Sequence, residues 1–75
     1  MSLFISIDPG KSKCGLLLAD MESGHIIEAG ISSLNKFCEV VFLWNQKYNI
    51  CKVVIGDGTN CKYIKNQLQK KNILN

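Results

Sequence analysis

Short apolar runs separated by polar turns make up the first half of the chain. Residues 3–7 form an apolar, β-branched run that stops at Pro9-Gly10, and a second apolar run covers residues 14–19 before the polar turn at 20–24. A third run, about residues 25–31, alternates apolar and polar positions, which is typical of a strand with one covered face and one wetter face. We predict three strands joined by short turns, with the third at or near a sheet edge.

Helical periodicity takes over in the second half. Apolar residues recur at steps of three and four between positions 34 and 48, which predicts a helix of about four turns with one apolar stripe. Ser32 or Ser33 could cap the start of this helix by accepting hydrogen bonds from its free amides. A short strand at 52–56 and a second helix from residue 60 follow, and Asn72 ends that helix. The predicted stripe consists of Leu34, Phe37, Cys38, Val41, Trp44 and Tyr48.

The order of these elements, β-β-β-α-β-α, predicts the fold class. Hairpin-like turns make the first three strands antiparallel, and a strand that returns after a helix is expected to be parallel to the first. We therefore predict an α/β domain with a mixed sheet. Residues 73–75 look like the approach to a fifth strand, so residues 1–75 are expected to be the N-terminal part of a single domain.

The composition indicates the charge of the protein and the state of its cysteines, but it does not indicate a specific function. The 75 residues include nine lysines, no arginine and six acidic residues, for a net charge of +3, and the excess lies toward the end of the chain. Such a basic flank can attract a polyanion, although a solvated helix face explains it as well. Four cysteines without a Cys-x-x-Cys pair argue against zinc, and each lies in or beside an apolar segment, where it would be a reduced, small, buried residue.

We expect a cytoplasmic protein with no membrane partner. The free cysteines suit a reducing compartment. No cleavable leader precedes the first strand, and no apolar run approaches the roughly 20 residues that a membrane helix needs.

Two aspartates carry the candidate chemistry. Asp8 ends the first predicted strand and Asp57 follows the fourth. Neighbouring strands lie about 4.8 Å apart, so carboxylates at the same end of both strands can share a cation. Oxygen-only ligands favour Mg²⁺ or Mn²⁺ over zinc. We predict that Asp8 and Asp57 are metal ligands and catalytic residues; the alternative is that one forms a turn and the other caps a helix.

The residues around both acids suit a nucleic-acid backbone. Glycines next to them would let a bulky phosphodiester come close. The start of the second helix has free N–H groups that can hold an anion, and two lysines in the first turn could neutralise phosphates. The predicted nucleic-acid contacts are Gly10, Lys11, Lys13, Gly58, Thr59 and Asn60.

Residues 5–18, Ile-Ser-Ile-Asp-Pro-Gly-Lys-Ser-Lys-Cys-Gly-Leu-Leu-Leu, resemble the opening of the RuvC/YqgF group of Holliday-junction-resolvase-like nucleases, within the RNase H-like superfamily. In that group an aspartate ends strand one, Pro-Gly turns the chain and a glycine follows inside strand two, as Gly15 does here. Residues 53–60 resemble the end of strand four and the next loop in YqgF-like members, although resolvases proper tend to carry a glutamate in this region.

The resemblance implies an RNase H-like fold and a metal-dependent nuclease or resolvase acting on DNA junctions or on structured RNA such as ribosomal RNA precursors. The family also has a fifth strand and a C-terminal helix that bring further acidic residues, and this chain lacks them. By itself the chain is therefore expected to be a poor nuclease. A fragment of a longer protein, a homodimer in which a second chain completes the sheet, or lost activity would each account for this, and we favour the fragment.

Two other function classes stay open. One is a non-catalytic RNase H-like remnant that binds nucleic acid or a protein. The other is the phosphate-binding subdomain of an actin-like ATPase or sugar kinase, which shares the three-strand start. The phosphate loop of that superfamily usually has Thr or Ser directly after the glycine, where this chain has Lys11.

Overall fold

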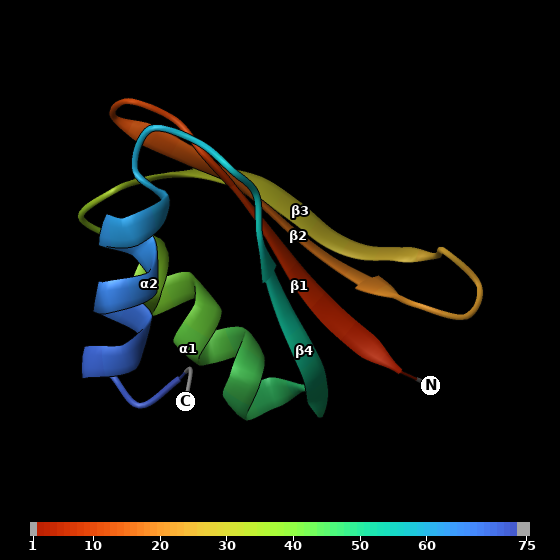
Figure 1. Ribbon diagram of the computed structural model, residues 1–75. Coiled ribbons are helices and arrows are strands. Elements are labelled where there is room, and N and C mark those ends of the chain that lie inside the picture. The colour runs from red at the N-terminus through yellow and green to blue at the C-terminus, as the bar shows by residue number, and fades with distance from the viewer. Residues whose placement is uncertain (1, 74–75) are drawn as a thin grey trace.

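A computed structural model describes residues 2–73 and contains the six elements in the predicted order (Figure 1). The first strand covers the apolar run at residues 3–7 and ends at Pro9, as predicted. Each later element begins within a few residues of its predicted position. The elements are β1 (Leu3–Pro9), β2 (Lys13–Asp20), β3 (Ile26–Ser33), α1 (Phe37–Lys47), β4 (Ile50–Ile55) and α2 (Cys61–Lys70).

The four strands form one mixed sheet in the order β3-β2-β1-β4. β1 pairs antiparallel with β2, β2 pairs antiparallel with β3, and β4 lies parallel to β1. The predicted α/β class and mixed strand directions are therefore confirmed, and β3 is an edge strand as expected. β1 lies between β2 and β4 in the sheet. A residue at the carboxyl end of β1 therefore has β2 on one side and the loop after β4 on the other.

Both helices lie on one side of the sheet (Figure 1). Alternate residues of β1 and β2 point to that side and are buried, because successive side chains of a strand point to opposite faces. Helix α1 adds Phe37, Val41 and Trp44, one turn apart, and α2 adds Ile64 and Leu68. The predicted stripe thus packs into the core. From the sheet the core receives Leu3, Ile5, Ile7, Cys14, Leu16 and Leu18.

No described element covers the opposite face of the sheet, which we call the open face. Strand pairing places Phe4 beside Lys52, Ser6 beside Val54, and Leu17 beside Ala29 on this side. Although no described element covers it, the open face is mostly apolar. Its apolar members are Phe4, Leu17, Ala19, Ile26, Ala29, Ile31 and Val54.

The prediction for β3 was wrong about which of its faces is covered. Ala29 and Ile31, expected on the covered side, lie on the open face, and Ile31 is 78% exposed. The pairing register shifts between Leu18 and Ala19, which breaks the simple alternation and lets Ile27 pack against the core. A single irregularity of this kind changes which face each side chain occupies.

The predicted serine cap of α1 was also wrong. Ser32 and Ser33 belong to β3, where they pair with Cys14 and Lys13 of β2. The helix starts at Phe37 after a turn, and its N-cap residue Lys36 makes no side-chain capping bond. Because Ser32 and Ser33 pair with β2, they lie in the sheet and not at the start of α1.

The four cysteines are free thiols in different surroundings. Cys14 is buried, as predicted, and Cys38 and Cys61 are partly buried. Cys51 is exposed on β4, so the expectation that every cysteine is a buried residue was wrong for this one. Cys51 lies at the register shift between β1 and β4, where Leu3 pairs with Ile50 and Phe4 pairs with Lys52, so Cys51 has no pairing partner on β1.

Helix α2 ends where Asn72 was predicted to end it. Asn72 takes a left-handed backbone conformation with φ of 58°. The Ile73 N–H donates to Leu68 O at 2.9 Å and the Asn72 N–H donates to Gln69 O at 3.1 Å, the two bonds of a Schellman motif. The predicted approach to a fifth strand extends over residues 74–75, which lie outside the described part.

Candidate functional site

The candidate site forms where the parallel strands β1 and β4 end. Both carboxyl ends lie at the same edge of the sheet because the strands run in the same direction, with Ile7 paired to Ile55. The Gly56 N–H then donates to Ile7 O at 2.9 Å, which continues the pairing one residue past β4. The loop at 56–60 therefore starts directly beside Asp8.

Asp8 lies on the open face and is exposed. It shares this face with Ser6, two residues earlier on β1, and it pairs with Gly15 of β2. A side chain at position 15 would start 3.7 Å from the Asp8 Cβ atom, so glycine leaves room beside the carboxylate. This room continues into a shallow depression over β1, β2 and β3. Its open-face lining includes Ser6, Asp8, Gly15, Leu17, Ala29 and Ile31.

Asp57 is exposed in the loop after β4. The residue level with Asp8 is Gly56, whose added Cβ would lie 3.9 Å from Asp8 Oδ1, and Asp57 follows it. Within residues 2–73, His, Cys, Asp and Glu side chains form no group of three or more that could hold a metal ion. Two carboxylates with several waters are still a usual ligand set for Mg²⁺. The carboxylates of Asp8 and Asp57 are oxygen ligands of the kind that Mg²⁺ and Mn²⁺ prefer, and both residues lie at this edge of the sheet.

The glycines of the two loops are required by the packing of the chain itself. A Cβ at Gly58 would lie 2.9 Å from Pro9 O, and one at Gly10 would lie 2.6 Å from Lys13 O. Both are distances that side chains do not tolerate. Gly10 lets the turn between β1 and β2 close on itself, and Gly58 lets the loop after β4 pack against the end of β1. This is a different reason from the predicted approach of a ligand.

Asn60 joins the two loops. Its side-chain amide donates to Gly10 O at 2.6 Å and to Lys11 O at 3.1 Å, across about 50 residues of chain. Asn60 is also the N-cap residue of α2 and makes no side-chain capping bond there. Because its amide donors are used inside the chain, its contribution to a site is to hold the turn between β1 and β2 against the start of α2.

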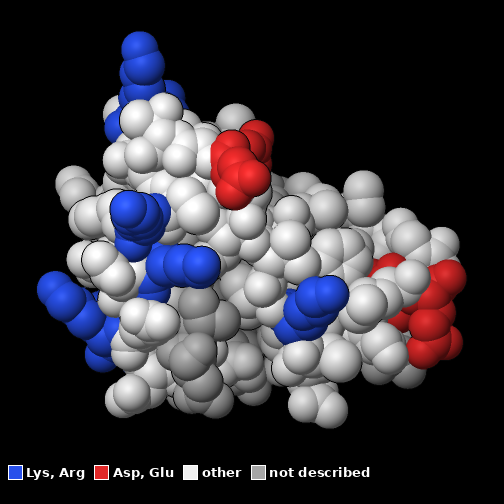
Figure 2. Space-filling view, in the orientation of Figure 1, with Lys and Arg blue, Asp and Glu red and all other residues white. Residues whose placement is uncertain are grey.

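The remaining predicted contacts surround this edge. Lys11 and Lys13 are exposed in or beside the turn that follows Asp8, and Thr59 is exposed before α2. Most of the lysines visible in Figure 2 lie toward the end of the molecule that holds the helices and this turn. Acidic side chains also gather at the opposite end of the molecule (Figure 2), which is the end that holds the turn between β2 and β3 in Figure 1.

The sequence analysis did not include Ser6 among the site residues, and it did not place Gly15 beside Asp8. Both lie on the open face next to Asp8, and the strand period of two was the signal that could have identified Ser6. The pairing partner of Asp8 depends on the hairpin register, which the sequence left open.

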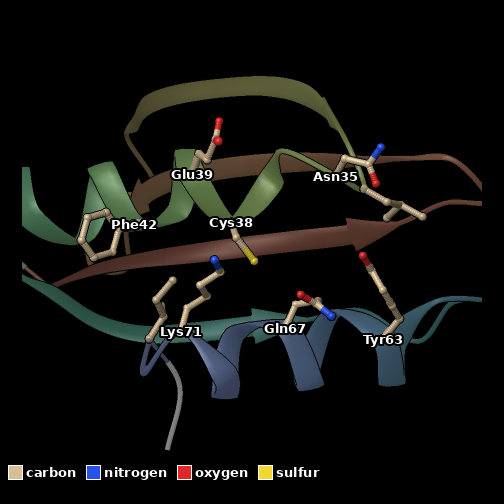
Figure 3. A pocket seen from close by; sticks show the side chains of 9 residues that line it. Asn35, Cys38, Glu39, Phe42, Tyr63, Gln67 and Lys71 are labelled. Atoms are coloured by element: carbon tan, nitrogen blue, oxygen red, sulfur yellow. The ribbon is translucent and has the colours of Figure 1, made fainter.

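A second hollow of about 390 Å³ lies between the two helices, away from the strand ends (Figure 3). Cys38 of α1 lies on its floor, and Lys71 approaches from the end of α2. Burial raises the pKa of the Cys38 thiol, while the positive charge of Lys71 acts in the opposite direction. The thiol is therefore protonated at neutral pH and has no nucleophilic activation. Residues from both helices line this groove: Leu34, Asn35, Cys38, Glu39, Phe42, Tyr63, Gln67, Lys71 and Ile73.

No protein-family model, curated protein or solved structure matches this chain. Among residues 2–73, no helix has the length and apolar character needed to cross a membrane. A function is therefore inferred from the residues of the chain and from where the strands place them.

Proposed function

We propose that this chain is the N-terminal part of an RNase H-like domain of the RuvC/YqgF type, a divalent-metal-dependent module that acts on structured nucleic acid. The observation that carries the proposal is the position of Asp8. It lies at the carboxyl end of the inner strand β1, beside the loop that leaves the parallel strand β4. The strand order and directions are those expected for the first four strands of such a domain.

Each residue then has a defined task. Asp8 anchors Mg²⁺ or Mn²⁺, and Asp57 contributes a second carboxylate. The ion, when bound, would supply a hydroxide and stabilise charge on the phosphorus. Lys11 and Lys13 neutralise neighbouring phosphates of the substrate. Asn60 keeps the loop of Lys11 next to the loop of Asp57 through its hydrogen bonds to Gly10 and Lys11.

Cleavage by these residues alone should be weak. Asp8 and Asp57 would give a divalent ion only two protein ligands, and the described residues add no third acidic ligand. The same observation favours a second candidate, a nucleic-acid-binding module without catalysis. The two candidates differ in whether binding depends on the metal.

The test is a Mn²⁺ titration followed by NMR. Paramagnetic Mn²⁺ should broaden the amide signals of Asp8, Gly15 and Gly56 first, because these residues surround the proposed ion. Asp8→Asn should reduce the affinity for Mn²⁺ by at least about tenfold, since one unit of carboxylate charge is lost from a site with few ligands. Glu22→Gln is the matched control, because it removes an exposed acid at the far end of the molecule.

Broadening that Asp8→Asn leaves unchanged would contradict the metal site. Binding of a four-way DNA junction and of an RNA hairpin is then measured with Mg²⁺ and with EDTA. Binding that needs Mg²⁺ and Asp8 supports the nuclease-type module, and binding that needs neither supports the non-catalytic candidate. A rise in melting temperature with ATP would point to the kinase-like class instead.

A further inference from the structure

One side of α2 carries only side chains that can donate hydrogen bonds. The helix packs Ile64 and Leu68 into the core, and Tyr63 and Gln67 line the groove toward α1 (Figure 3). The residues left to solvent recur at steps of three and four, which keeps them on one stripe of the helix. We call this side the outer stripe of α2. It consists of Lys62, Lys65, Asn66, Gln69 and Lys70, which are all exposed.

The sequence of α2 and of the turn between β1 and β2 contains no acidic residue. Residues 58–75 have no Asp or Glu, and neither do residues 9–19. A solvent-exposed helix face usually mixes both charges, because Glu and Lys three or four residues apart stabilise a helix. Lys62 and Lys65 are three residues apart, so they repel each other instead. A polyanion bound along the outer stripe would remove this repulsion.

The outer stripe begins beside the turn between β1 and β2. The Asn60 amide donates to Gly10 O at 2.6 Å and to Lys11 O at 3.1 Å, and α2 starts at the next residue. Lys11 and Lys13 are exposed in or beside this turn. Most lysines visible in Figure 2 lie on the side of the molecule that α2 and the turn occupy in Figure 1. The turn and the outer stripe thus form one basic surface next to the ends of β1 and β4.

A duplex fits this surface better than a single strand does. Proteins hold single-stranded nucleic acid with aromatic side chains on which the bases stack, and the outer stripe carries none. The exposed rings of Phe42 and Tyr63 line the groove between the helices instead. Lys, Asn and Gln side chains are usual donors to the phosphate oxygens of a duplex. From Lys62 to Lys70 the stripe is about 12 Å long, the axial length of about three or four phosphates of one strand.

We propose that a double-stranded arm of the nucleic acid lies along the outer stripe of α2, with its phosphates on Lys62, Lys65 and Lys70. This inference rests on the proposed function. The backbone that reaches the ion at Asp8 and Asp57 continues over the turn between β1 and β2 onto α2, and the ion neutralises the two acids next to this path. Contacts to the backbone fix the direction of the arm and the affinity, and they read no base sequence.

The experiment measures the binding of a four-way DNA junction in EDTA at a series of salt concentrations. No divalent ion takes part in EDTA, so the outer stripe is tested apart from the metal site. Each lysine on a phosphate contributes about −0.9 to the slope of the logarithm of the association constant against the logarithm of the salt concentration. Changing Lys62→Gln and Lys65→Gln together should make the slope shallower by about 1.8 and weaken binding at least about tenfold at physiological salt.

Two further variants control for charge and folding. Lys47→Gln with Lys52→Gln removes the same charge from exposed positions outside the basic surface, at the end of α1 and on β4, and should leave the slope nearly unchanged. Lys62→Arg with Lys65→Arg keeps the charge and should keep the slope. Gln and Arg form helices about as well as Lys, so the circular dichroism spectrum and melting temperature should stay those of the wild type.

A junction bound with an unchanged slope by the Lys62→Gln, Lys65→Gln variant would overturn this inference and leave the metal site of the proposed function standing. An equal change of slope in the Lys47→Gln, Lys52→Gln control would overturn it as well, because net charge alone would then account for binding. Tighter binding of a single strand of the same length, or equally effective displacement by polyglutamate, would assign the surface to another partner. A chain that binds no nucleic acid, with or without Mg²⁺, would overturn the proposed function together with this inference.

Discussion

Two neighbouring glycines in the loop after β4 meet different surroundings. A Cβ at Gly56 would have ordinary contacts, 3.6 Å to Ile7 O and 3.7 Å to Pro9 Cδ. At Gly58 the same atom would lie 2.9 Å from Pro9 O, which is backbone and cannot move away easily. Neither glycine has a positive φ, so steric space alone separates them. The loop is thus held against the end of β1 most tightly at Gly58.

We predict that Gly58→Ala lowers the free energy of unfolding by about 1–3 kcal/mol, because the added methyl group overlaps the backbone. Gly56→Ala should change it by less than about 1 kcal/mol, since the loss of backbone freedom in the unfolded chain offsets any small contact cost. Urea unfolding of both variants measures the difference. Equal losses for the two variants would show that the loop is not packed at Gly58 as described.

At the scale of elements, α2 shows how a helix end is stabilised by one residue. Asn72 occupies the left-handed position of the Schellman motif, and Ile73 then packs against the core. Among L-residues asparagine tolerates this conformation comparatively well, and glycine tolerates it without cost. The motif turns the chain back toward the sheet at the end of α2.

We predict that Asn72→Ala lowers the free energy of unfolding by about 1 kcal/mol, whereas Asn72→Gly preserves or slightly raises it. Asn66→Ala is the matched control, because it makes the same change at an exposed position inside α2. There alanine is the better helix former, so stability should rise slightly. Thermal unfolding compares the three variants, and a loss at position 66 equal to that at 72 would contradict the role of the motif.

At the scale of the whole molecule, Asp20 ties the start of the chain to the turn between β2 and β3. Its carboxylate accepts hydrogen bonds from the Ser23 hydroxyl at 2.8 Å, from the Ser23 N–H at 3.2 Å and from the Ser2 N–H at 3.1 Å. The Ser23 hydroxyl, followed by the backbone donors, holds the pKa of Asp20 below its ordinary value of 3.8. These bonds favour the ionised carboxylate in the folded chain.

Asp20 therefore stabilises the fold in a pH-dependent way. Because its folded pKa is lowered, its contribution is complete above pH 3.8 and is lost as the pH falls through the folded pKa. Asp20→Asn should lower the melting temperature at pH 7, and the gap to the wild type should close in strong acid. Glu22→Gln, at the exposed neighbouring acid, is the control. A gap that stays constant down to pH 2 would contradict this role of the carboxylate.

The strands, the helices and their order could be predicted from the sequence because they depend on local patterns. The run before Pro9-Gly10 was predicted to be a strand that ends at a turn, and the stripe through Phe37, Val41 and Trp44 was predicted to be the buried face of a helix; the structure confirms both. Asp8 at the end of β1 followed from the same reasoning. These features depend on the period of apolar residues and on turn chemistry, which neighbouring residues determine by themselves.

Only the tertiary structure decided which face of β3 is bare, that Ser32 and Ser33 pair with β2, and that the amide of Asn60 holds a turn about 50 residues away. Each of these depends on a pairing register or on a contact between distant segments. A shift of one residue exchanges the two faces of a strand, and a hydrogen bond between distant loops leaves no periodic trace in the chain. The amino-acid pattern therefore determined the elements and the place of Asp8, and the packing of those elements determined what surrounds it.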